Sequence, residues 1–275
     1  MGRRRLGAEL RRLRESRLMT LGQVAGALGV AQSTLSRIET GKSPTRGGYL
    51  SLMLDVYGVD DPARRQEFMD LARDGRGKRW WSSADELLPA GLGDYLGLEA
   101  EASVVRAFTV QVPHALVQTC DYARAVLTAS RPYLAPEQVD QLLAVHEHRV
   151  ALISGTESVE LRVVLDESAL LRAIAPAPVL TRQLEHLLEL GDQPNLTIQV
   201  LGLKAARAIL ARPFATLSFA DPDDRDVLCA EGVAGQVLVS DRAGDVRGAL
   251  ARFRALAEAA LTPEESADLI RTNAR

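Results

Sequence analysis

The stretch over residues 18–45 constrains the fold more than any other part of the chain, because it contains two short helical patterns around a tight turn. Thr20 is a good N-cap for a first helix over residues 21–28, whose apolar residues share one face. Gly29 follows at the position where a left-handed backbone conformation commonly ends a helix. The same apolar spacing predicts a second helix over residues 32–39.

The predicted outer face of the second helix carries side chains suited to reading DNA. They are Gln32, Ser33, Thr34, Ser36 and Arg37. In the major groove Gln pairs with adenine through two hydrogen bonds, Arg pairs with guanine, and hydroxyls reach bases or phosphates. None of these residues is a Glu or Lys, the types that usually fill a solvated helix face. A polar, solvated helix in a small bundle is the alternative when this helix is taken alone.

The segment resembles the XRE class of helix-turn-helix DNA-binding domains, the phage-repressor type. The resemblance rests on V-A-x-x-L-G-V followed by S-T-L-S-R-I-E-x-G, and it covers residues 6–59. It implies base contacts from Gln32, Ser33 and Arg37, with residues 32–39 as the recognition helix. Contacts to phosphates or neighbouring bases are implied for a second group: Thr34, Ser36, Lys42, Ser43 and Arg46.

Two positions depart from the pattern of that class. Leu21 stands where many members carry a phosphate-binding Gln, and Ala31 stands where Ser or Thr usually caps the recognition helix. An Ala at the N-cap costs about 1 kcal/mol relative to those residues. We therefore expect a modest affinity for DNA, or help from a partner.

Three further helices complete the predicted head. Leucines at helical spacing predict a helix over residues 4–16, and two more are predicted over residues 47–57 and from Pro62 onward. The resemblance pairs Arg14, near the end of the first of these helices, with Glu39 at the end of the recognition helix. This ion pair would attach the two helices to each other.

The charge distribution separates this head from the rest of the chain. Residues 1–60 hold ten Lys and Arg and five Asp and Glu, a net charge of +5. The remaining residues hold 23 and 31, a net charge of −8. A basic head on an acidic body suits a protein that presents only its first domain to the phosphates of DNA.

The chain is long enough for two domains. We place a helix-turn-helix domain at residues 1–73, a linker at 74–84, and an α+β domain that binds an effector or a partner at 85–275. The linker contains two glycines, three basic residues and both tryptophans. Such a cluster could stack on a nucleotide, but we favour the tryptophans as anchors to the following domain.

The second domain alternates amphipathic helices with short apolar strands. Strands are predicted over residues 104–112, 159–165, 195–200, 214–219, 226–231 and 235–239. The last three lie at hairpin-like spacing, which predicts a mostly antiparallel sheet. Residues 202–212 interrupt the strands with an apolar and basic segment that could close over a ligand, dock a partner, or form a short helix on the sheet. Thr262 begins a capping box for a last helix.

This domain resembles the one that follows XRE heads in many actinobacterial regulators, the WhiJ-like group. The motifs include V-P-x-x-L-V-Q-T-x-x-Y-A-R-A-V from Val112 and V-V-L-D-E-S-A-L-L-R from Val163, and the resemblance covers residues 99–270. It implies transcriptional control of development or secondary metabolism, often beside a gene for a small partner protein. His114-Ala115 and Cys229-Ala230 depart from the pattern.

No motif in the sequence favours catalysis over binding. Asp166 and Glu167 could act as paired carboxylates, but a helix N-cap followed by a first-turn acid is the simpler role. His146 and His148 lie about 200° apart around a predicted helix, so they cannot face one metal ion. Cys120 is expected to be a buried thiol. We predict no metal, no cofactor and no enzymatic activity.

These patterns together predict a cytoplasmic, dimeric, sequence-specific DNA-binding regulator modulated by a small molecule or a small protein partner. No apolar run is long enough to span a membrane, and the N-terminus lacks the apolar core of a secretory signal. A dimer is expected because helix-turn-helix readers usually bind two half-sites. One alternative is an antitoxin-like protein that mainly neutralises a small neighbour protein. The other is an enzyme that uses Asp166, Glu167, Glu231 and His114 in one cleft.

Overall fold

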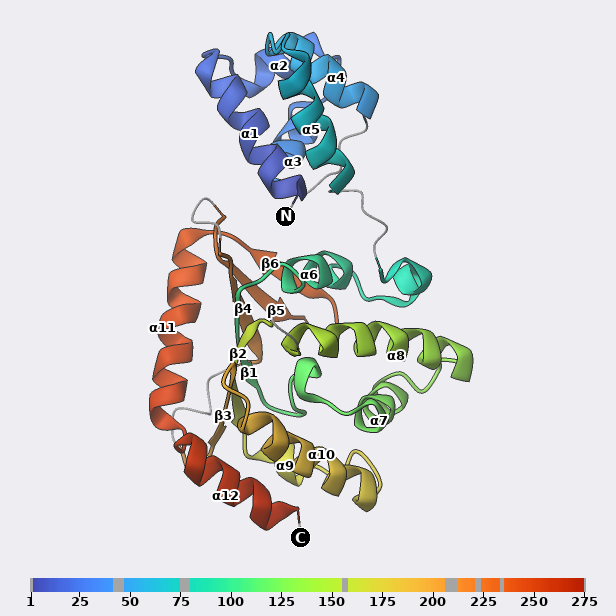
Figure 1. Ribbon diagram of the computed structural model, residues 1–275, viewed down its shortest axis with the longest axis vertical. Coiled ribbons are helices and arrows are strands. Elements are labelled where there is room, and N and C mark those ends of the chain that lie inside the picture. The colour runs from blue at the N-terminus through green and yellow to red at the C-terminus, as the bar shows by residue number, and fades with distance from the viewer. Residues whose placement is uncertain are drawn as a thin grey trace. The chain divides into compact units, whose positions relative to one another are not determined.

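The computed structural model describes residues 2–41, 47–74, 80–154, 158–205, 212–220, 224–232 and 235–274. The chain divides into two compact units, Met1–Arg79 and Trp80–Arg275 (Figure 1). Each unit is built around a hydrophobic core of its own. No helix among the described residues is long and apolar enough to cross a membrane.

The first unit contains five helices among its described residues. They are α1 (Gly2–Ser16), α2 (Leu21–Ala27), α3 (Gln32–Glu39), α4 (Gly47–Val56) and α5 (Pro62–Asp74). Each contributes apolar side chains to one core, including Leu10, Val24, Leu35, Leu50 and Phe68. Helices this short are marginal by themselves, so the shared core supplies most of their stability. The predicted helical head is confirmed.

α1 and α3 approach each other closely at Gly7. A Cβ atom placed on Gly7 would lie 2.6 Å from the carbonyl oxygens of both Ile38 and Glu39. Backbone atoms cannot move aside as a flexible side chain can, so only glycine fits. This contact sets the distance between α1 and the end of α3.

The second unit contains a six-stranded mixed sheet with the strand order β3-β2-β1-β4-β5-β6. The strands are β1 (Val104–Thr109), β2 (Glu160–Asp166), β3 (Leu196–Leu201), β4 (Phe214–Ser218), β5 (Val227–Glu231) and β6 (Val237–Ser240). β1, β2 and β3 pair in parallel, whereas β1–β4, β4–β5 and β5–β6 pair antiparallel. The predicted α+β domain with a mostly antiparallel sheet is confirmed.

Helices cover both faces of this sheet (Figure 1). On one face lie α6 (Leu92–Glu99), α7 (Cys120–Ser130), α8 (Pro136–Val150) and α10 (Ala177–Gly191), and α11 (Ala243–Ala259) lies on the other. The one-turn helix α9 (Ser168–Leu171) follows β2, and α12 (Pro263–Asn273) packs on α10 and β3. Within the described parts of the chain, 3-10 helices lie at Ser82–Leu87, Ala115–Val117 and Ala151–Ile153.

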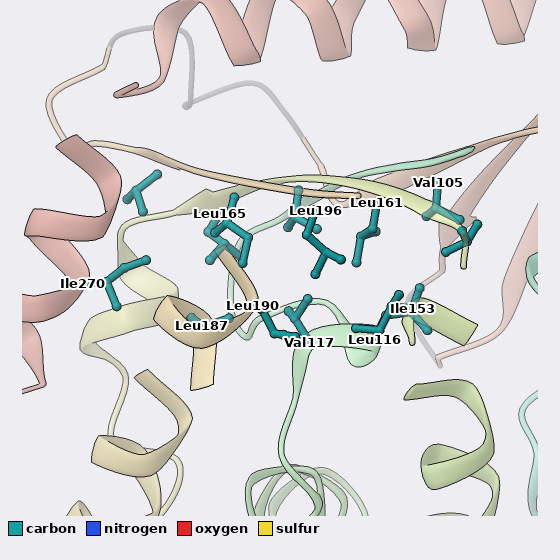
Figure 2. Close-up of a cluster of buried hydrophobic side chains, with 14 of the residues drawn as sticks. Val105, Leu116, Val117, Ile153, Leu161, Leu165, Leu187, Leu190, Leu196 and Ile270 are labelled. Carbon is teal, nitrogen blue, oxygen red and sulfur yellow. The ribbon is translucent and has the colours of Figure 1, made fainter. Parts of the chain in front are cut away.

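The larger core of this unit lies between the sheet and the first group of helices. Figure 2 shows Val105, Leu161 and Leu165 from the strands, with Leu116, Val117 and Ile153 from the 3-10 turns and Leu187 from α10. On the opposite face a smaller cluster joins Phe108, Val164 and Phe214 to Ala249, Phe253 and Leu256 of α11. The sheet is therefore buried on both sides at its centre.

The start of α9 corrects one prediction. Glu167, and not Asp166, occupies the N-cap position, and it makes no side-chain capping bond. The Asp166 carboxylate still accepts a hydrogen bond from the backbone amide of Ser168 at 2.9 Å. The helix that begins here is only one turn long, because the extended backbone of Arg172 ends it.

Both tryptophans belong to the second unit. Trp81 is buried against Leu96, Leu142 and Val145, and Trp80 stacks on His148 with ring centroids 4.2 Å apart. The predicted role of the tryptophans as anchors is confirmed by these contacts. The 3-10 helix Ser82–Leu87 lies partly within the predicted linker, and residues 75–79 of that linker lie outside the described residues.

Candidate nucleic-acid interface

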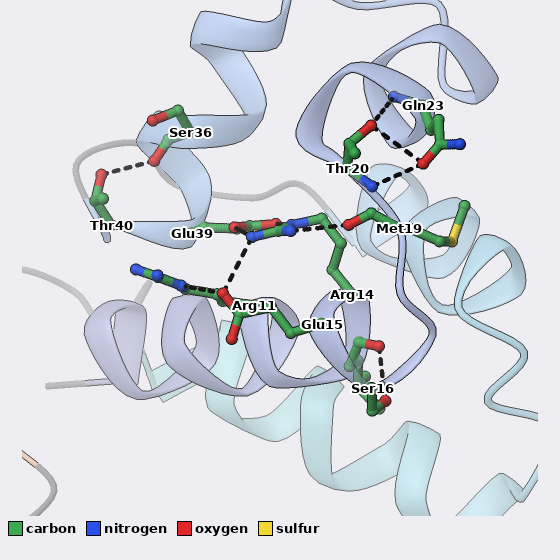
Figure 3. Close-up of polar contacts among 11 residues, drawn as sticks. Arg11, Arg14, Glu15, Ser16, Met19, Thr20, Gln23, Ser36, Glu39 and Thr40 are labelled. Atoms are coloured by element: carbon green, nitrogen blue, oxygen red, sulfur yellow. Dashed lines mark hydrogen bonds and ion pairs between the residues drawn. The ribbon is translucent and has the colours of Figure 1, made fainter.

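The start of α2 and the turn between α2 and α3 are fixed by hydrogen bonds. Thr20 and Gln23 form a capping box, in which Thr20 Oγ1 accepts from the Gln23 amide at 3.2 Å and Gln23 Oε1 accepts from the Thr20 amide at 2.8 Å (Figure 3). Gly29 has a φ of 66°, which glycine adopts at little cost. The amide of Val30 then donates to the carbonyl oxygen of Ala25 at 3.0 Å. The sequence therefore specifies locally the direction in which α3 leaves the turn.

α3 turns one side to the core and the other to solvent. Leu35 and Ile38 are buried, while the five residues predicted to contact DNA are exposed or half-exposed: Gln32, Ser33, Thr34, Ser36 and Arg37. Ser33 and Arg37 stand four residues apart and so lie one above the other on the helix. Among the described residues, no hydrogen bond or ion pair engages the side chains of Gln32, Ser33 or Arg37. They are available to an external partner.

The first turn of α3 has no side-chain cap. Ala31 is the N-cap residue and supplies no hydrogen bond from its side chain. Helix amides in the first turn have no acceptor within the helix, and they attract anions such as phosphate. At the other end, Thr40 Oγ1 donates to the Ser36 carbonyl at 2.7 Å, and Gly41 adopts a φ of 68°.

Three of the predicted phosphate contacts cannot be placed. Lys42, Ser43 and Arg46 lie outside the described residues. Their assignment stays a prediction, as do the base contacts assigned to Gln32, Ser33 and Arg37.

The predicted ion pair between Arg14 and Glu39 is present. Arg14 Nε lies 2.7 Å from Glu39 Oε1 and Nη2 lies 2.9 Å from Oε2, while Nη1 donates to the carbonyl of Met19 at 2.9 Å (Figure 3). Only 10% of the Arg14 side chain and 4% of the Glu39 side chain are exposed. The hydrogen bond to Glu39 raises the pKa of Arg14 above its ordinary value. The pair thus joins α1, the turn after it and the end of α3.

The residues of the proposed catalytic group have separate contacts in the second unit. Among the described residues, no hydrogen bond or ion pair joins any two of His114, Asp166, Glu167 and Glu231. Asp166 and Glu167 each accept a backbone amide hydrogen bond, and Glu231 is exposed at the end of β5. His114 instead contacts the hydroxyl of Tyr95, at 3.3 Å.

Sequence reasoning missed a buried hydrogen-bonded chain that ends in a charge pair. The Leu116 amide donates to His114 Nδ1 at 3.4 Å, which leaves Nε2 to donate to the Tyr95 hydroxyl. Tyr95 donates to Glu99 Oε1 at 2.6 Å, and Arg149 holds the same carboxylate through bonds of 2.7 and 2.9 Å. The i, i+4 spacing of Tyr95 and Glu99 is visible in the sequence. Their distant partners have no such signal.

Burial governs the charges in this chain of residues. Burial alone would raise the pKa of Glu99, but the adjacent Arg149 guanidinium outweighs it and holds that pKa below its usual value. Burial also lowers the pKa of His114 to about 4, so its imidazole is neutral near pH 7. A salt-bridged carboxylate and a neutral histidine with satisfied nitrogens suit a structural role.

The remaining candidate residues also have structural contacts. His146 is buried with Nε2 3.1 Å from the carbonyl of Gln118, whereas His148 stacks on Trp80, so the two histidines contact different partners. Cys120 is half-buried rather than fully buried. Burial and the nearby carboxylate of Glu147 raise the pKa of its thiol, which makes it a poor nucleophile.

Two family matches agree with this two-part structure. Residues 5–68 match a family described as Helix-turn-helix domain, which spans the capped turn and the exposed face of α3. Residues 92–272 match a family described as Domain of unknown function (DUF5753), and this match spans more than half of the chain. The chain belongs to the DUF5753 family. No curated protein and no solved structure matches it. This DUF5753 protein carries a helix-turn-helix DNA-binding domain and is a DNA-binding regulator.

Proposed function

We propose that this DUF5753 protein is a cytoplasmic transcriptional regulator of the XRE class that reads a specific DNA sequence with α3. The observation that carries the proposal is the exposed face of α3, where Gln32, Ser33 and Arg37 have no partner among the described residues. Buried contacts through Leu35, Ile38 and the Arg14–Glu39 pair hold the other side of the helix. A helix that is held rigidly and presents side chains with free hydrogen-bonding groups suits recognition in the major groove.

Each side chain has a distinct role in this proposal. Arg37 would bind the edge of a guanine and Gln32 that of an adenine, both through two hydrogen bonds. Ser33 would contact a neighbouring base. Thr34, Ser36, Lys42, Ser43 and Arg46 would hold phosphates or nearby bases, which fixes position rather than sequence preference.

We further propose that the protein binds DNA as a homodimer. One recognition helix of eight residues buries little surface, and helix-turn-helix proteins usually gain affinity by binding two half-sites about 34 Å apart. The side chain of Ala31 makes no capping bond to this helix. A second half-site would therefore contribute more to the affinity for DNA.

The C-terminal domain, in this proposal, is WhiJ-like and binds an effector or partner rather than catalysing a reaction. The separate partners of His114, Asp166 and Glu167 support this role, as does the raised pKa of the Cys120 thiol. A catalytic site needs a nucleophile, a base and an orienting group within reach of one another.

The proposal can be tested by selecting binding sites from a pool of random duplex DNA with the full chain. We expect an enriched two-fold-symmetric site. Arg37→Ala should then lose its preference for that site over scrambled DNA. Arg64→Ala is the matched control, since it removes the same charge from an exposed position on α5 and should keep the preference. Failure to enrich any sequence, or an Arg37→Ala variant with full preference, would refute the recognition-helix assignment.

A further inference from the structure

Different segments of the chain lie against the two edges of the sheet. On β6 the amide of Val237 donates to the carbonyl of Ala90 at 2.9 Å, and a Cβ placed on Gly91 would lie 2.1 Å from the carbonyl oxygen of Val237. The backbone of residues 90–91 therefore covers this edge at Val237, the first residue of β6. A backbone group that is covered in this way cannot pair with another strand.

The opposite edge, formed by β3, is covered only at its ends. The amide of Val200 donates to Ser266 Oγ and its carbonyl accepts from the Leu261 amide, both at 2.9 Å. At the start of the strand the Leu196 amide donates to the Gln193 carbonyl at 3.1 Å.

The middle of β3 presents free backbone groups. β3 pairs in parallel with β2, and the Leu161 amide donates to the Asn195 carbonyl. Alternate residues of a strand direct their backbone amides and carbonyls toward the same neighbour, so those of Thr197 and Gln199 also point toward β2. The residues between them direct their backbone amides and carbonyls away from β2, toward the open edge of the sheet. Among the described residues, the amide and carbonyl of Ile198 and the carbonyl of Leu196 have no hydrogen-bond partner.

A groove of about 420 Å³ lies beside this part of the strand, between α10 and α12. Figure 1 shows both helices next to β3, and Figure 2 shows Leu187 of α10 and Ile270 of α12 below the strands. Both side chains line the groove together with Leu196 and Ile198, and all four are buried. The groove therefore has an apolar base along a free strand edge.

The mouth of the groove is acidic. Asp192, Glu264 and Asp268 are exposed in its lining, and the one basic residue there, Arg271, lies 2.5 Å from Asp268. Among the described residues, Asp192 and Glu264 at this mouth have no ion-pair partner. Such a mouth favours a positively charged occupant.

We propose that the groove between α10, β3 and α12 binds an extended, positively charged segment of a partner protein, which adds a strand to the free edge of β3. The backbone groups of Ile198 would pair with the peptide backbone, and an apolar side chain would enter the base. A Lys or Arg of the segment would lie beside Asp192 or Glu264.

This inference deepens the proposed function, because it assigns a site and a partner class to the C-terminal domain. The experiment is a selection of random displayed dodecapeptides on the full chain, followed by affinity measurement with labelled peptides. We expect peptides in which basic and apolar residues alternate. Methylation of one backbone nitrogen that pairs with Ile198 should weaken binding about fivefold or more, through the loss of one hydrogen bond.

Two double variants separate the site from general charge effects. Asp192→Asn with Glu264→Gln should weaken peptide binding at least about tenfold. Glu137→Gln with Glu258→Gln is the matched control and should leave it unchanged. Glu137 follows Pro136 in the first turn of α8 just as Glu264 follows Pro263 in α12, and Glu258 is an exposed acid on α11.

The outcomes are distinct. The groove assignment would be overturned by a selection that yields no peptide. It would also be overturned by peptides that bind both double variants alike, or that tolerate backbone methylation at every position. The same variants are assayed on selected DNA. Loss of peptide binding with intact DNA recognition supports the groove, whereas a chain that binds the peptide but no specific DNA refutes the proposed function and leaves the groove standing.

Discussion

Arg14 and Glu39 are joined by two parallel hydrogen bonds, and both side chains are almost completely buried. This geometry is the strong form of the Arg–carboxylate pair. Because α3 carries the face proposed to read DNA, a contact that fixes the end of α3 to α1 also fixes the orientation of that face. We therefore expect substitutions in this pair to affect DNA recognition as well as stability.

Arg14→Ala should destabilise the head by about 3–5 kcal/mol, since it leaves the Glu39 carboxylate buried without its partner. Hydrogen exchange of the amides in α1 and α3 would measure the change in the full chain. Arg11→Ala is the control, because Arg11 and Glu15 form an exposed pair worth about 1 kcal/mol or less. Equal effects of the two substitutions would contradict a structural role for the buried pair.

Gly7→Ala should also destabilise the contact between α1 and α3. The new Cβ would meet two backbone carbonyl oxygens at 2.6 Å, and overpacking of this kind costs about 1–3 kcal/mol. Gly26→Ala provides the contrast, because a Cβ there meets nothing within 4 Å and glycine is a poor helix residue. Thermal unfolding should give a lower midpoint for the first variant and an equal or higher one for the second.

Recognition of bases and of phosphates should be separable. Arg37→Ala is expected to lose about 1–3 kcal/mol of discrimination at one base pair. Lys42→Ala should instead weaken binding to all sequences and reduce the slope of log affinity against log salt by about one. Titrations of cognate and scrambled duplexes at several salt concentrations measure both effects, and the two assignments fail if the variants behave alike.

Local signals explain why the bounds and the buried side of α3 could be predicted from the sequence. The bounds of α3 coincide with the predicted residues 32–39, because Gly29, Gly41 and the apolar pair Leu35 and Ile38 all act within one or two turns. Even the predicted capping box at Thr262 is present. These features depend only on neighbouring residues, so the sequence displays them directly.

Non-local contacts could not be predicted in the same way. Glu99 pairs with Arg149, which lies fifty residues later in the chain. The parallel pairing of β1 with β2 joins strands that are separated in sequence by two α-helices and two 3-10 helices. No periodicity in the sequence indicates which distant segments pair. The free edge of β3 and the groove beside it likewise arise only when α12, at the far end of the chain, packs on α10.

The stability of the C-terminal domain should fall as the pH drops from about 6.5 toward 4. His114 has a folded-state pKa of about 4, so the unfolded chain binds its proton first and is favoured below the unfolded pKa of about 6.5. Protonation would also break the bond from the Leu116 amide to His114 Nδ1. Urea unfolding can be followed through the buried Trp81.

His114→Gln should flatten this pH dependence between about pH 6.5 and 5, a range in which most carboxylates stay ionised. His186→Gln is the control, since His186 lies near the surface beside Glu189. The buried His146, whose pKa burial also lowers, contributes in the same direction and sets the residual slope. An unchanged slope in the His114 variant would show that this imidazole does not govern the acid sensitivity.

Removal of residues 80–275 should leave a head that recognises its operator weakly and no longer responds to any effector. The head has its own core, so it is expected to fold. In the proposed homodimer the second unit would hold two heads together, and the separate head would lose that link. Fusion of residues 1–79 to a leucine zipper separates the loss of DNA affinity from the loss of the response to an effector. The zipper should restore affinity by bringing two recognition helices together, yet leave reporter expression insensitive to the conditions that regulate the full chain. If the bare head binds with full affinity and is regulated normally in cells, the C-terminal domain of this DUF5753 protein has a role other than dimerisation and control.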